Sequence, residues 1–154
     1  MREYWWWIIY TVAAVWLQRF FPGLDFFLPG LILCLQLRKY HYAFWFGLVW
    51  IFIQEGTGTM TFGACLLWYM VLVLIFFWFR FFFSTGSFVF ILLLSVFVGF
   101  WHWAVVHIMS ELQEVAVDTE ILILESLQTI LLFPVIWGVL YYLRMRWVLD
   151  RSHV

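Results

Sequence analysis

The chain of 154 residues is far more apolar than a soluble domain of its length. Hydrophobic residues make up 67% of it, charged residues only 11%, and the mean hydropathy is +1.01. A soluble core could not bury so much apolar surface, and the formal net charge of −1 gives no support to nucleic-acid binding. The composition therefore predicts a single all-α integral membrane domain over residues 1–154.

Six apolar segments follow one another along the chain. A membrane core of about 30 Å needs roughly 20 helical residues, and residues 24–37 and 40–53 fall short of this length. Arg38 and Lys39 separate these two segments. In a re-entrant hairpin both cations would lie near mid-membrane, where each costs at least about 2.5–3.5 kcal/mol. We therefore expect two thin spans and a compact bundle of six transmembrane helices at residues 4–21, 24–37, 40–53, 61–83, 87–110 and 122–143. The first segment is expected to be a retained span and not a cleaved signal peptide.

Charged residues sort by sign between the two ends of the predicted bundle. One end collects the basic residues Arg2, Arg38, Lys39, Arg80, Arg144, Arg146 and Arg151. The other end collects Asp25, Glu55, Glu111, Glu114, Asp118 and Glu120, together with Arg19. Because basic loops stay on the cytoplasmic side, we expect both termini to be cytoplasmic.

The most distinctive polar stretch is QEGTGTMTFG, which begins at Gln54 and Glu55. Its glycines, among them Gly58 and Gly63, would let the backbone turn tightly before the fourth span. Glu55 is either a carboxylate that caps this turn at the outer headgroup level, the interpretation we favour, or a proton or cation site.

The sixth span carries three further candidates. Glu125 and Gln128 lie one helical turn apart and are expected to face the bundle. Pro134 removes one backbone hydrogen bond in mid-helix. Since intramembrane acidic residues are often functional, we weigh a functional and a purely structural role for Glu125 equally. With Gln54, Glu55, Gly58 and Gly63, these residues form the predicted partner or cavity set.

His102 and His107 lie in the fifth span, within WHWAVVH. Residues five apart point about 140° apart on an α-helix, and no neighbouring Cys or carboxylate completes a ligand set. We favour an interface position or interhelical hydrogen bonding over metal or haem binding, and we expect no cofactor. No catalytic triad, nucleotide loop or zinc signature is present in the sequence, which favours a non-enzymatic protein.

The order of these features resembles MreD, the six-span rod-shape-determining membrane subunit of bacteria. The first similarity is the short second span with its basic turn, at residues 31–39. The second is residues 46–63, where Gln54 and Glu55 stand at the position of the family's Gln-Asp. The third is the end of the chain, with Leu132-Phe133-Pro134 followed by Arg144-x-Arg146. Glu55 replaces the family's Asp, and the Asn often found before the last Pro is absent.

This resemblance implies a scaffold in the bacterial cytoplasmic (inner) membrane. It would bind a single-span MreC-like partner and other subunits of the peptidoglycan elongation machinery that sets cell shape. Two other classes stay open from the residues. One is the small-molecule-binding subunit of an energy-coupling-factor transporter, whose pocket the aromatic residues could line. The other is a redox or quinone-associated subunit, suggested by His102, His107 and the twelve tryptophans.

Overall fold

The structure is a computed structural model that describes residues 2–21, 23–56, 63–112, 114, 116 and 118–149. These residues form six α-helices and a short π-helix. The bounds are α1 Arg2–Phe20, α2 Phe27–Gln36, α3 Tyr40–Gly56, α4 Ala64–Phe82, α5 Phe88–Leu112, α6 Thr119–Arg144 and η1 Met145–Leu149. The prediction of an all-helical chain with six helices is confirmed, and the predicted bounds agree with these to within three residues.

Three helices within the described residues are long and apolar enough to cross a membrane. They are Ala64–Phe82, Phe88–Leu112 and the continuous run Thr119–Trp147. The chain is therefore a membrane protein by the length and composition of its helices. In contrast, α2 has ten residues, which gives a length of about 15 Å. Crossing by the first three helices stays a prediction.

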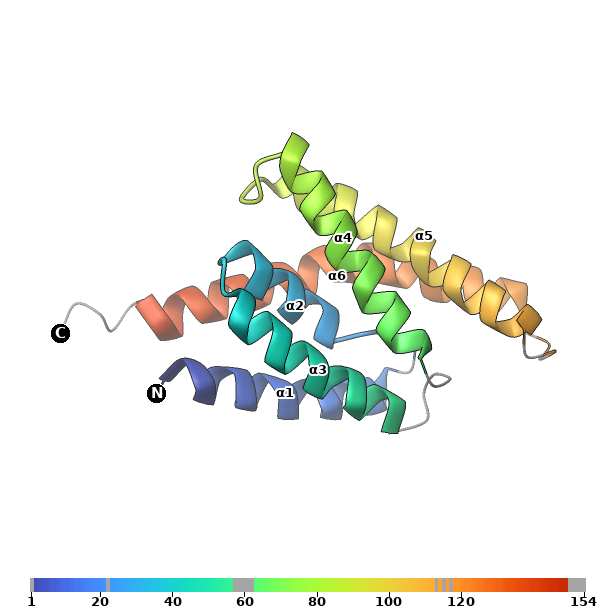
Figure 1. The fold of residues 1–154 in the computed structure, drawn as a ribbon, viewed down its shortest axis with the longest axis horizontal. Coiled ribbons are helices and arrows are strands. Elements are labelled where there is room, and N and C mark those ends of the chain that lie inside the picture. The colour runs from blue at the N-terminus through green and yellow to red at the C-terminus, as the bar shows by residue number, and fades with distance from the viewer. Residues whose placement is uncertain are drawn as a thin grey trace.

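Consecutive helices run in opposite directions, so the six form an up-and-down bundle (Figure 1). The start of α1, the end of α6 and the connections α2–α3 and α4–α5 all lie at one end. We call this the basic end, because it carries Arg38, Lys39, Arg80, Arg144 and Arg146. At the opposite end lie the end of α1 and the start of α2, the end of α3 and the start of α4, and the end of α5 and the start of α6. This end carries most of the acidic residues that the structure describes. The fold therefore preserves the charge separation expected from the sequence.

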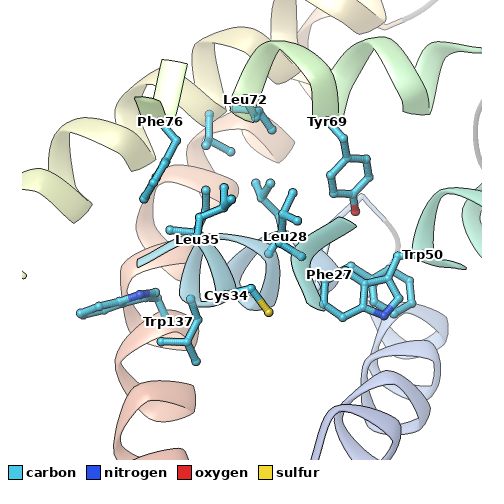
Figure 2. Close-up of a cluster of buried hydrophobic side chains, with 14 of the residues drawn as sticks. Phe27, Leu28, Cys34, Leu35, Trp50, Tyr69, Leu72, Phe76 and Trp137 are labelled. Atoms are coloured by element: carbon cyan, nitrogen blue, oxygen red, sulfur yellow. The ribbon is translucent and has the colours of Figure 1, made fainter. Parts of the chain in front are cut away.

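The short helix α2 lies in the centre of the bundle, enclosed by its neighbours (Figure 1). All of its residues from Phe27 to Leu35 are buried. Phe27 stacks on Trp50 of α3 at 5.4 Å between ring centroids, and Leu72 and Phe76 of α4 are fully buried against the same core (Figure 2). Since lipid provides no hydrophobic driving force between helices, this dense packing and the polar contacts described below hold the bundle together.

Two glycines allow neighbouring helices to approach closely. A Cβ atom on Gly30 of α2 would lie 2.3 Å from Cε1 of Tyr10 on α1. The Tyr10 hydroxyl accepts a hydrogen bond from the Gly30 N–H at 3.1 Å and donates one to the Phe26 carbonyl. A Cβ atom on Gly99 of α5 would lie 2.2 Å from Cγ1 of Ile130 on α6. Only glycine fits either position without displacing a neighbour.

An ion-pair cluster joins three segments at the basic end. Oε1 of Glu3 in α1 accepts from Lys39 Nζ in the α2–α3 connection and from Arg144 Nη2 in α6, the latter at 3.4 Å. The Arg144 side chain is buried, with its guanidinium 5.7 Å from the Trp7 ring centroid. A single, partly exposed carboxylate thus compensates two cations, of which only Arg144 is buried. Removal of Glu3 would leave that buried charge without a partner, which is costly.

Candidate functional site

The largest polar contact network among the described residues forms around Asp25, in the connection between α1 and α2. Its Oδ1 accepts from Gln54 Nε2 of α3 at 2.9 Å, and its Oδ2 accepts from the Tyr69 hydroxyl of α4 at 2.7 Å. The Cys65 thiol, one turn before Tyr69, donates to Gln54 Oε1. We call these four residues the Asp25 cluster. It links two helices to the entry of the central helix α2.

The position of Asp25 follows from its local sequence. It lies two residues before the first residue of α2, and its Oδ1 also accepts from the Phe27 and Leu28 N–H groups at 2.9 and 3.3 Å. A short acidic side chain is well suited to satisfy the free N–H groups at a helix start. Both carboxylate oxygens therefore accept hydrogen bonds, which indicates that Asp25 has a structural role and is not a reactive group.

Sequence reasoning found one member of this cluster and missed three. Gln54 was among the predicted residues, whereas Asp25 had been interpreted only as an external charge. The signal that could have found Asp25 is its position two residues before an apolar run that begins a helix. For Cys65 and Tyr69 no signal was available, because a single Cys or Tyr in an apolar helix is ordinary.

Glu55 does not join the Asp25 cluster. Its Oε1 accepts from the backbone N–H of Gly63 at 2.9 Å. Gly63 precedes α4 with φ +86°, a left-handed conformation that favours glycine. The carboxylate thus joins the end of α3 to the residue that precedes α4, which is the kind of contact that the turn-capping interpretation describes. Gly58 lies outside the described residues.

Glu125 of α6 meets the fifth helix and the first connection. Its Oε2 lies 3.8 Å from His102 Nε2 of α5. Its carboxyl group also packs on Gly23, where a Cβ atom would come within 2.9 Å of Glu125 Cδ. The buried His102 ring stands edge-on to Trp68 at 5.6 Å. His102 therefore lies at the interface of α5 and α6, but its Nε2 is too far from the Glu125 carboxylate for a hydrogen bond.

The two histidines do not share a site. His107 is exposed, stacks on Trp103 at 5.3 Å and lies 3.5 Å from Glu111 within the same helix. Among the described residues, no group of three or more His, Cys, Asp or Glu side chains is arranged to hold a metal ion.

Gln128 differs from the other candidates because it points away from the bundle. It is exposed on α6 and makes no hydrogen bond to any described residue. It lies nine residues after Thr119, about 14 Å along the helix. Pro134 lies further along the same helix, which continues through it to Arg144. A polar amide on an apolar membrane helix needs a hydrogen-bond partner.

Comparisons with known proteins identify no relative. No protein-family model, no curated protein and no solved structure matches the chain.

Proposed function

We propose that this protein is a non-enzymatic scaffold of the bacterial inner membrane, resembling MreD, that binds the transmembrane helix of a single-span, MreC-like protein. The proposal rests on one observation: Gln128 is an exposed amide in a helix long enough to span the membrane. Interhelical hydrogen bonds from such side chains contribute about 0.6–2 kcal/mol to association. Left without a partner, the amide would face lipid.

The residues around Gln128 favour a helical partner. Exposed residues follow one another at alternating spacings of three and four along one face of α6, the pattern of a helix-packing seam. This α6 seam consists of the exposed residues Ile121, Leu124, Gln128, Leu131 and Val135 and of the half-buried Gly138. A Cβ atom on Gly138 would meet no atom within 4 Å, so a second helix has room to approach there.

The first test of the seam is Gln128→Leu. We expect it to weaken co-purification of the single-span partner about threefold to thirtyfold, the equivalent of one interhelical hydrogen bond. Gln18→Leu, which removes the same amide from α1, is the matched control and should have no effect. An equal loss in both variants would argue against the seam.

A photo-crosslinking experiment locates the contact directly. A photoreactive residue at Leu131, in the seam, should capture a peptide from the transmembrane segment of a single-span protein. One at Val96 of α5, which is also exposed, should not. Lipid adducts alone at Leu131 would contradict the proposal. A stoichiometric small ligand in native mass spectrometry would instead favour the transporter-subunit alternative.

The same proposal includes six crossings and cytoplasmic termini. It is supported by the antiparallel order of the helices and by the basic end (Figure 1). Arg38→Cys tests it, because Cys34 and Cys65 are buried and should not react with an impermeant thiol reagent. Labelling of residue 38 only from the cytoplasmic side is expected. Labelling only from the outside would refute the topology.

A further inference from the structure

An apolar groove of about 260 Å³ lies between α3 and α4. Leu31 of α2 forms its floor, and the small residues Ala43 and Gly47 of α3 leave it open. On the other side, Met70 and Leu74 of α4 line the groove and are themselves exposed. The groove therefore opens on the surface that faces lipid.

Both walls of the groove continue to the basic end. Tyr40 lies seven residues before Gly47 on the same face of α3, and Phe77 follows Leu74 by three residues on α4. Their ring centroids are 5.9 Å apart, so the two rings mark the end of the groove. One turn further along α4, Arg80 Nη1 donates to the Tyr40 hydroxyl. The apolar groove thus ends at an arginine.

The cations beside this end of the groove lack counter-charges. In the part of the chain that the structure describes, neither Arg80 nor the exposed Arg38 forms an ion pair with a carboxylate. The nearby Glu3 is already shared between Lys39 and Arg144. At the level of the lipid headgroups, the abundant anion that could balance these charges is a phosphate.

We propose that the α3–α4 groove binds one anionic phospholipid. An acyl chain lies along Ala43 and Gly47, and the phosphate is held by Arg80 and Arg38. The planar guanidinium fork suits phosphate oxygens. The uncompensated positive charge favours a headgroup with net negative charge over a zwitterionic one. This site lies on α3 and α4 and is independent of the proposed α6 seam.

Native mass spectrometry of the full chain tests the headgroup. The protein is exchanged into nanodiscs of dioleoyl phosphatidylglycerol or dioleoyl phosphatidylcholine, and we expect one phosphatidylglycerol to be retained preferentially. Arg80→Gln should weaken its binding about fivefold, the effect of one cation near an anionic surface, whereas Arg80→Lys should retain the preference. Arg146→Gln removes a cation from the basic end away from the groove and is the matched control.

A second pair of variants tests the acyl-chain groove. Gly47→Leu fills it, and a Cβ atom there would meet Leu31 Cδ1 at an ordinary 3.6 Å, so the fold should tolerate the change. Retention of both lipids should fall, whereas Gly138→Leu should leave it unchanged. Equal retention of the two lipids, or equal effects of Arg80→Gln and Arg146→Gln, would overturn the proposal. Displacement of the bound lipid by millimolar inorganic phosphate, or a protein found in the groove, would overturn it as well.

Discussion

Replacement of Asp25 should destabilise the bundle more than any other single loss of a carboxylate outside the ion-pair cluster. Asp25→Ala removes the acceptor for Gln54, for Tyr69 and for two backbone N–H groups at the start of α2. Side-chain hydrogen bonds between membrane helices contribute about 0.6 kcal/mol on average and up to about 1.7 kcal/mol. Loss of a helix-capping acid costs about 1 kcal/mol more. We expect a total of about 2–4 kcal/mol.

Two milder variants divide this effect. Asp25→Asn keeps one oxygen for the helix start and for Gln54, and its amide can donate to the Tyr69 oxygen, so it should cost about 1 kcal/mol. Tyr69→Phe removes one hydrogen bond and should cost about 0.6–1.7 kcal/mol. Unfolding in bicelles by added SDS, followed by tryptophan fluorescence, measures these differences.

Asp118 provides the control, because its exposed side chain caps α6 and, among the described residues, accepts from the Glu120 N–H alone. Asp118→Ala should therefore cost about 1 kcal/mol. If Asp25→Ala costs no more than this, the cluster does not hold the helices together. A double-mutant cycle between Asp25→Ala and Gln54→Leu should show coupling, and additivity to within about 0.5 kcal/mol would refute the contact.

Two further predictions concern the glycines at close helix approaches. Gly99→Ala would place a methyl group 2.9 Å from the Ser126 carbonyl oxygen, so thermal unfolding should show a loss of stability of about 1–3 kcal/mol. Gly138→Ala is the control and should leave the stability unchanged. An equal loss of stability in both variants would contradict the close approach at Gly99. Gly30→Ala should displace the Tyr10 ring and break its hydrogen bonds. If Gly30→Ala costs less stability in a Tyr10→Leu background than in the unmodified protein, the contact between Tyr10 and Gly30 is confirmed. An equal cost in both backgrounds would exclude it.

The six helices could be predicted because their causes are local. Apolar length and the separation of charges mark each helix, and Arg38 with Lys39 separates α2 from α3. The sequence predicts a short second helix, but the start of α2 at Phe27 could not be predicted from the apolar run 24–37. Asp25 lies within the predicted segment 24–37, but its side chain satisfies the N–H groups at the helix start and therefore lies outside the helix.

The contacts between helices could not be read from spacing. Asp25 and Tyr69 lie 44 residues apart in the chain, and no periodicity relates residues in different helices. His102 shows the same limit: the sequence offered no carboxylate beside it, whereas the fold brings Glu125 from the next helix to 3.8 Å. The exposure of Gln128 depends likewise on which face of α6 packs against α5, because the sequence pattern had suggested the opposite direction.

The enclosure of α2 has a consequence for biogenesis. On the ribosome this helix is made before α3, α4 and α6, the neighbours that cover it in the finished protein. At about 15 Å it is too short to settle across a bilayer by itself. We therefore expect the insertion machinery to shelter it until later helices arrive. A chain truncated after α3 should then be cleared by membrane proteases and should not accumulate.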